Sequence, residues 1–376
     1  AYTTAKPIAA YELLDPPHSV LPGAAAGQQR LREVGHALRA ANVRAIYLLH
    51  GTFAGVDAVG AIRELRPTVP KVADQLQHGV KEWVDWLMGP VGNYTRDYAE
   101  RFENGIADPA HRRIPVRLFE WTGENNHVGR AEGAVRLIDS LAGEDCPPGG
   151  RIMIWGHSHG GNVLALMSNL LAGSADDRQH FFAAARSLMR RSSSGAAHAH
   201  VWQATRDWLS RPDSPLAGRA LDLVTFGTPI RYGWDTGGFA RLLHFVHHRP
   251  RDEAPAYQAV LPDSADDVLH ARDGDYVQHV GVAGTDFPPY LFSWRSWQAE
   301  RRLVRLLEPG LKRRDLLQRV ECGRRVPDDG MTLLVDYAGT SPDGAEELAG
   351  HAVYTLPEWL PFHCEEIVRR FYPNEA

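Results

Sequence analysis

The sequence predicts an α/β protein with a mostly parallel central sheet flanked by helices. Three observations support this. Short apolar runs recur along the chain, and most are followed by glycine and then by a segment with helical spacing. These runs are continuous rather than alternating, which is typical of strands buried on both faces. The 376 residues are 44% hydrophobic, which is enough for a substantial core, and we expect one domain spanning 1–376.

Strands and helices are expected to alternate along the chain. The expected strands are Ala45–Leu49, Ile114–Trp121, Arg151–Trp155, Leu221–Phe226, Leu242–His247 and Met331–Tyr337. Apolar residues at helical intervals predict helices over Arg130–Leu141, Gly161–Leu171 and Pro357–Phe371. This alternation favours a doubly covered parallel sheet.

Two longer segments, 54–105 and 173–219, are predicted to be helical insertions. The first contains KEWVDWLM, and the second contains HFFAAARSLMRR and HVWQATRDWL. Their aromatic residues fit peripheral packing. They also fit a cap in which Trp83, Trp86 and Phe181 line an apolar substrate pocket, and both interpretations stay open. The segment Pro250–Arg272 is expected to be a surface loop.

Charge and composition narrow the range of partners. A net charge of −5 suggests neither a nucleic acid nor an anionic membrane surface as a partner. No stretch approaches the roughly 18 apolar residues of a membrane span, and the first residues have no signal-peptide layout. We therefore expect a soluble protein, with the cytoplasm slightly favoured, while a leader removed before Ala1 stays open. Three cysteines, Cys146, Cys322 and Cys364, stand in neither a redox nor a metal spacing.

The stretch IWGHSHGG, Ile154–Gly161, places Ser158 between an expected strand and an expected helix. A sharp strand-to-helix turn can hold its central residue in a strained conformation and expose that side chain above the sheet. Such a turn needs small residues two positions before and two positions after, and Gly156 and Gly160 meet this need. The pattern therefore predicts a nucleophilic serine.

This motif resembles the nucleophile elbow of the α/β-hydrolase superfamily, and within it the esterase and lipase branch. The resemblance covers most of the chain, from about Ala45 to Phe371, and it is specific for the superfamily but not for a substrate. It implies an α/β-hydrolase fold with cap-like helical insertions. It also implies an oxyanion hole before the serine, and an acid and then a histidine after it.

The oxyanion hole is expected in His50-Gly51-Thr52-Phe53, which resembles the HG-type turn after the family's third strand. The resemblance implies that Thr52 or Phe53 supplies one backbone N–H donor. The other is the N–H of His159, the residue after Ser158.

The base is predicted to be His351, in a loop between the last expected strand and the final helix, where the family carries its catalytic histidine. His157 and His159 adjoin Ser158, but neighbours in a sharp turn point their side chains away from its central residue. His363 lies inside the last helix and is expected to be structural.

The acid must follow the strand LLHFVH and precede His351. Asp275, in Gly274-Asp275-Tyr276-Val277, resembles the family's frequent Asp-x-Val arrangement, and Asp273 and Asp252 stay open as alternatives.

Two other patterns need an interpretation. Phe226-Gly227-Thr228-Pro229 resembles a turn common in lipases of this fold, although glycine followed by proline is by itself only a turn signal. His244, His247 and His248 would alternate between the faces of a strand, so we expect no metal site there.

The favoured function is hydrolysis of carboxylic esters through an acyl-enzyme on Ser158, with no cofactor and a small-molecule or lipid ester as substrate. An acyltransferase, a thioesterase or a phospholipase with the same triad is an alternative. A non-catalytic binding protein of this fold is a further one. The substrate and the oligomeric state do not follow from the sequence.

Overall fold

The computed structural model describes residues 9–52, 93–188, 196–211, 216, 218–281, 294–337 and 350–373. Within these residues the chain forms a seven-stranded, all-parallel sheet in the order β1-β7-β6-β5-β4-β2-β3. The strands are β1 (Ala10–Leu14), β2 (Val43–Leu49), β3 (Val116–Phe119), β4 (Arg151–His157), β5 (Ala220–Phe226), β6 (Arg241–His247) and β7 (Met331–Val335).

All six expected strands are confirmed, and the α/β class with them. The expectation of the usual α/β-hydrolase sheet is corrected, because this strand order is not the usual one of that fold. Strand β1, which pairs with β7 at the edge of the sheet, is not among the strands that the sequence predicts. Its residues are mostly exposed, so it is stabilised by backbone pairing and lacks the apolar run that marks a buried strand.

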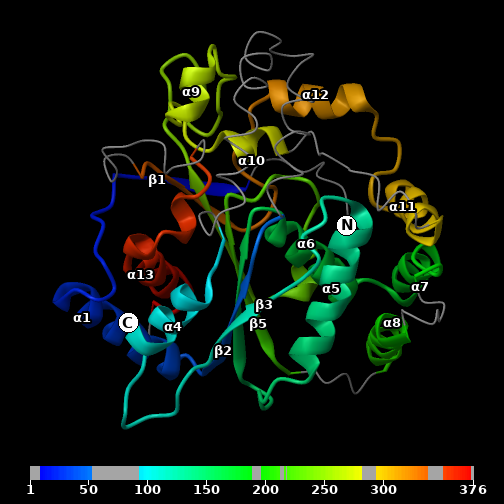
Figure 1. Cartoon of the computed structure of the whole chain (residues 1–376), viewed down its shortest axis with the longest axis horizontal. Helices are drawn as coiled ribbons and strands as arrows, with labels where there is room; N and C mark the ends of the chain where they lie inside the picture. The colour runs from blue at the N-terminus through cyan, green and yellow to red at the C-terminus, as the bar shows by residue number, and fades with distance from the viewer. Residues whose placement is uncertain are drawn as a thin grey trace.

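Helices cover both faces of the sheet (Figure 1). One face carries α1 (Ala25–Ala40), α4 (Arg96–Gly105) and α13 (Leu360–Phe371), whose apolar residues pack with the sheet in one core cluster. The other face carries α5 (His127–Ala142) and α6 (His159–Ala172) in a second cluster. The continuous apolar runs are explained by this double coverage, since both faces of each central strand are removed from water.

The described part of the insertion 173–219 packs into the second cluster. It forms α7 (Ala175–Ala184) and α8 (Ala196–Leu209). Phe181 is fully buried and stacks on Trp202, with the ring centroids 6.2 Å apart. These contacts place Phe181 in the core of the α5 face. Of the insertion 54–105, the structure describes α4 and the residues just before it, whereas Trp83 and Trp86 lie outside the described residues.

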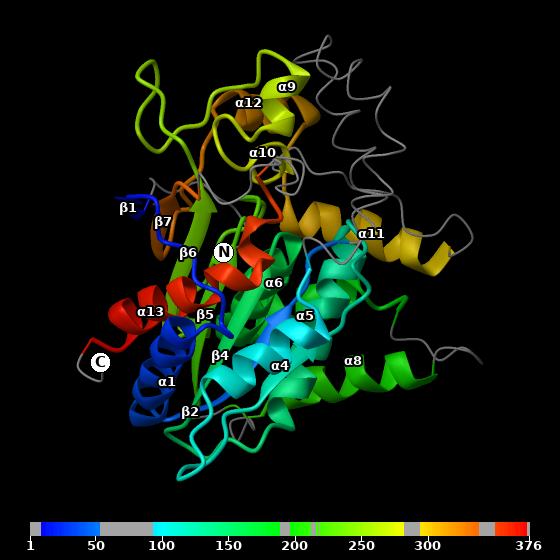
Figure 2. The same ribbon diagram turned by 60° about the vertical axis from the view of Figure 1, so that its left-hand side comes forward.

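Three helices gather beyond the carboxyl end of the sheet. They are α9 (Ala265–Leu269), α10 (Tyr276–Val280) and α12 (Arg313–Glu321), and Figures 1 and 2 both show them at that end. The short α9 falls in the segment expected to be a loop. The helix α11 (Trp294–Leu307) lies between α12 and α7 in Figure 1 and packs against α5 and α7.

Among the described helices, none has both the length and the apolar character that a bilayer span requires.

Candidate active site

Ser158 lies in the turn between β4 and α6 and has the backbone conformation that the motif predicts. Its φ is 52° and its ψ is −131°, a region that residues other than glycine rarely adopt and that costs about 1–3 kcal/mol. The turn is held by the Ser158 N–H, which donates to the carbonyl oxygen of Phe226 over 2.8 Å. The Thr228 hydroxyl donates to the Ser158 carbonyl oxygen over 2.9 Å. The FGTP segment therefore fastens the serine turn to the end of β5.

The two flanking glycines are required by close approaches. A Cβ atom on Gly156 would lie 2.8 Å from the nitrogen of Gly161. On Gly160 it would lie 2.7 Å from the carbonyl oxygen of His50. Both obstacles are backbone atoms that cannot move aside without shifting a strand or helix. The spacing in IWGHSHGG thus follows from the packing of α6 onto the ends of β4 and β2.

The segment after β2 lies directly against the serine. A Cβ atom on Gly51 would lie 2.8 Å from the Cβ atom of Ser158. Thr52, the next residue, is buried, and His159 is the first residue of α6, where backbone N–H groups point along the helix toward its amino end. The structure therefore brings Gly51, the neighbour of Thr52, against Ser158, and His159 follows Ser158 at the start of α6. Phe53 lies outside the described residues.

His351 and Asp275 are paired. The Nδ1 atom of His351 donates to Oδ2 of Asp275 over 2.7 Å, and the carboxylate is completely buried. Asp275 follows the end of β6, precedes α10 and accepts the Gln278 N–H at its other oxygen over 2.8 Å. Among the described residues, the Ser158 hydroxyl makes no hydrogen bond to the His351 ring, and such contacts are often looser before substrate binds.

The surroundings of Asp275 favour its charged form. Burial alone would raise the pKa of this carboxyl group, but the nearby His351 charge, the His351 hydrogen bond and the Gln278 N–H outweigh burial and hold the pKa below its ordinary value. An ionised carboxylate can fix the tautomer of the imidazole and stabilise it when it takes up a proton.

Two residues that the sequence analysis did not single out support this carboxylate. The Tyr354 hydroxyl donates to Oδ2 of Asp275 over 2.9 Å and accepts the His247 N–H over 2.7 Å. The buried Arg325 donates through Nη1 to the Asp275 carbonyl oxygen and through Nη2, over 3.0 Å, to that of Asp273. The only local signal for Tyr354 was its position three residues after His351, and Arg325 had none.

His157, to which the sequence assigned no role, holds the loop of His351. Its Nε2 atom donates to the His351 carbonyl oxygen over 3.1 Å, and the two ring centroids are 4.7 Å apart. Burial, and then the charge of His351, lowers the pKa of His157 to about 3, so this ring stays neutral. The side chain of His159 is buried too, and its Nδ1 atom accepts a hydrogen bond from Asn162.

No family model, curated protein or solved structure matches the chain. Its chemistry is therefore inferred from the geometry of the site.

In the described part of the chain, neither of the other two aspartates is bonded to His351. Asp273 is buried, pairs with Arg251 and accepts the Tyr276 hydroxyl over 2.5 Å. Asp252 is exposed on the loop after β6. Of the three aspartates that the sequence left open, the structure brings Asp275 to the histidine.

The remaining histidines of interest have structural partners. His244, His247 and His248 bond to the carbonyl oxygens of Asp329, Val335 and Ala256, over 3.0, 3.0 and 2.7 Å. In the part of the chain that the structure describes, no three His, Cys, Asp or Glu side chains are grouped as metal ligands. His363, inside α13, accepts the Tyr337 hydroxyl over 2.8 Å.

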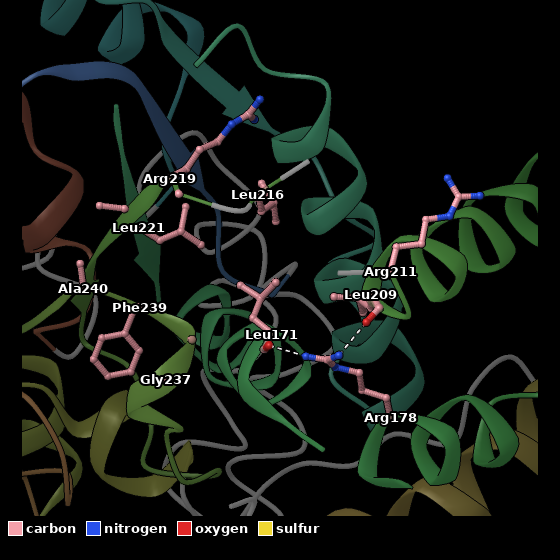
Figure 3. Close-up of a pocket in the computed structure, with 13 residues that line it drawn as sticks. Leu171, Arg178, Leu209, Arg211, Leu216, Arg219, Leu221, Gly237, Phe239 and Ala240 are labelled. Carbon is pink, nitrogen blue, oxygen red and sulfur yellow. Dashed lines mark hydrogen bonds between the residues drawn. The ribbon is translucent and has the colours of Figure 1, made fainter. Parts of the chain in front are cut away.

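A cavity of about 460 Å³ lies at the opposite, amino end of the sheet, at the starts of β5 and β6. Its described lining holds no histidine, carboxylate or hydroxyl. Figure 3 shows the Arg178 guanidinium bonded to the Leu171 and Leu209 carbonyl oxygens. The side chains of Arg211 and Arg219 point away from this guanidinium in the same view. Among the described residues that line this cavity, none could therefore act as a nucleophile or base.

Proposed function

We propose that this chain is a serine hydrolase that cleaves carboxylic esters through an acyl-enzyme on Ser158. The observation that carries the proposal is the 2.7 Å bond between His351 Nδ1 and the buried Asp275 carboxylate, on loops fastened to the turn of Ser158. A histidine held in this way presents Nε2 as a base. The strained conformation of Ser158 is of the kind that exposes a nucleophile.

The proposed reaction follows from the atoms present. Nε2 of His351 takes the proton of the Ser158 hydroxyl as Oγ attacks the acyl carbon, and Asp275 stabilises the imidazolium. The oxyanion receives N–H donors from Thr52 and His159, each worth about 3–4 kcal/mol in such reactions. The imidazolium then protonates the leaving alcohol. A water molecule, deprotonated by His351, attacks the acyl-enzyme and releases the carboxylic acid and free Ser158.

We also propose that the chain is a divergent α/β-hydrolase. Support comes from the order of the parts along the chain: the glycine turn after β2, then Ser158, Asp275 and His351. A strand runs directly into the serine turn and a helix leaves it. The position of β1 beside β7 departs from the usual sheet, so the family assignment rests on the site.

The test is covalent labelling with a fluorophosphonate probe, mapped by mass spectrometry and combined with turnover of p-nitrophenyl esters of increasing chain length. We expect the adduct on Ser158, and we expect Ser158→Ala to lower the turnover rate by roughly 10³–10⁶-fold while the protein stays folded. A thioester and a phospholipid in the same panel separate the alternative substrates.

A matched control is Ser210→Ala, which removes an exposed serine hydroxyl at the end of α8. It should leave labelling and turnover unchanged. Full esterase activity in Ser158→Ala would overturn the assignment of Ser158 as the nucleophile. A wild-type protein that neither binds the probe nor hydrolyses any ester would indicate a non-catalytic binding protein.

A further inference from the structure

The helix α11 carries exposed aromatic side chains on its outer face. Trp294 is 73% exposed, Trp297 41% and Val304 37%. The opposite face, with Ala299, Leu303 and Leu307, is buried in the core cluster of the α5 side. Large apolar side chains that are grouped on one exposed face, rather than scattered singly, are typical of interaction surfaces.

Two arginines complete this face. Arg301 and Arg305 are exposed, and spacings of three and four residues place Trp294, Trp297, Arg301, Val304 and Arg305 on one side of the helix. Neither arginine has an acidic partner among the described residues. We call these five side chains the α11 stripe. The net charge of −5, which suggested no anionic partner, conceals this basic surface.

The α11 stripe lies at the end of the sheet that holds Ser158. Glu300, on the inner face of α11, accepts the N–H groups of His127 and Val128 at the start of α5, over 3.1 and 2.8 Å. Helix α5 begins just beyond the carboxyl end of β3, at the same end of the sheet as the serine turn.

The far end of α11 is tied to the same region. Glu308, just past the helix, pairs with Arg231 through two contacts, of 2.5 and 3.0 Å. Arg231 lies three residues beyond Thr228, which bonds to Ser158. The middle of α11 and its carboxyl end are thus fixed relative to the candidate active site.

We propose that the α11 stripe docks the protein on an anionic lipid surface. Tryptophan side chains reside at the boundary between headgroups and acyl chains, and arginines beside them pair with lipid phosphates. The combination of exposed tryptophan and unpaired arginine fits such a surface better than it fits a neutral small ester. The proposal rests on the proposed function of Ser158 and makes membrane lipid esters the substrate class.

The test measures binding to vesicles by co-sedimentation, using Ser158→Ala so that no lipid is hydrolysed. Vesicles of phosphatidylcholine alone are compared with vesicles that also contain phosphatidylglycerol. We expect stronger binding to the anionic vesicles, weakened by salt. Trp294→Ala with Trp297→Ala should lower the affinity roughly tenfold or more. Arg301→Glu should remove most of the preference for anionic lipid.

Matched controls lie elsewhere on the surface. Leu21→Ala shortens an apolar side chain that is 60% exposed, and Arg32→Glu reverses an exposed charge on α1, across the sheet from α5. Both should bind vesicles like the parent protein. Equal losses in these controls would overturn the docking site. So would an oligomer in light scattering that the tryptophan substitutions dissociate, without vesicle binding, because the stripe would then join copies of this chain.

Turnover of a soluble short-chain ester by the wild-type protein is recorded in parallel. Turnover without vesicle binding overturns the docking proposal alone. Vesicle binding without turnover of any ester overturns the proposed function, and with it the substrate class.

Discussion

The Nε2 atom of His157 lies 3.1 Å from the carbonyl oxygen of His351, so the residue before the candidate nucleophile holds the loop of the candidate base. The link joins the end of β4 to a loop nearly two hundred positions later in the chain. It gives the two reacting side chains a common support that does not depend on a hydrogen bond between them.

Replacing His157 by Phe tests this support. The change keeps an aromatic ring and removes the donor to the His351 carbonyl. We expect kcat for a soluble ester to fall roughly tenfold or more, because the base is displaced. Unfolding should become easier by about 1–3 kcal/mol, since a buried carbonyl loses its partner. The matched control is His244→Phe, where a buried histidine bonded to the Asp329 carbonyl is lost. An equal loss of kcat in the control would contradict the role of His157.

Replacing Asp275 by Asn tests the choice among the aspartates. An amide in this position can hold the wrong tautomer of His351, and we expect kcat to fall by about 10³–10⁴-fold. Asp252→Asn, at an exposed position, should leave kcat unchanged. A larger loss in Asp273→Asn than in Asp275→Asn, with both proteins folded, would move the assignment to Asp273.

Replacing Tyr354 by Phe tests the second donor to Asp275. The His247 N–H also loses its acceptor, so the free energy of unfolding should fall by about 1–3 kcal/mol. Without the phenol donor the pKa of Asp275 should rise. The more basic carboxylate then stabilises the His351 imidazolium more strongly, so the acid limb of the kcat profile should move to higher pH. Tyr337→Phe loses the bond to His363 instead and should leave that limb in place. If the acid limb of the kcat profile does not move in Tyr354→Phe, the role of this tyrosine is purely structural.

Replacing Gly160 by Ala tests the tight packing of the serine turn. The added methyl group would meet the His50 carbonyl at 2.7 Å, so we expect a loss of stability of about 1–3 kcal/mol or more. Activity should fall further than stability alone explains, because His50 begins the proposed oxyanion segment. Gly23→Ala, where no atom lies within 4 Å of the new methyl group, is the control and should be nearly neutral. Chemical denaturation and ester turnover measure the two effects.

Buried histidines predict a loss of stability in mild acid. Burial lowers the pKa of His363 and of His157 to about 3, and that of His244 to about 4, from an ordinary value of 6.5. As pH falls below 6.5 the unfolded chain takes up protons that the folded chain does not. The contribution of these neutral rings to the free energy of unfolding is therefore complete above pH 6.5. It declines as the pH falls toward the pKa values of the folded protein. Each such histidine should cost about 2 kcal/mol between pH 7 and pH 5.

Urea unfolding at these two pH values measures the decline. His363→Phe should reduce the change in the free energy of unfolding between pH 7 and pH 5 by the contribution of one histidine. A free energy of unfolding that is the same at both values would show that these rings are protonated in the folded protein.

Much of the sheet could be predicted from local sequence, and the edge strand could not. Strands covered on both faces require continuous apolar residues, as in AIYLL and LDLVTF, and such runs are visible without any partner. The strand β1 reads AYELL and is mostly exposed. What makes it a strand is its pairing with β7, more than three hundred residues away along the chain. Because of that pairing, the strand order of this sheet differs from the usual order of the α/β-hydrolase fold.

The sequence by itself determined the turn around Ser158, because its glycines, its strand and its helix are all within a few residues of one another. It also determined His351 as a loop histidine near the end of the chain. Only the tertiary structure pairs Asp275 with His351 and shows the hydrogen bonds that His157, Tyr354 and Arg325 make to these two residues. The physical reason is that a turn is encoded by local sterics. The partner of a buried imidazole depends instead on which distant segments meet, and Asp275 reaches His351 across 76 positions of sequence.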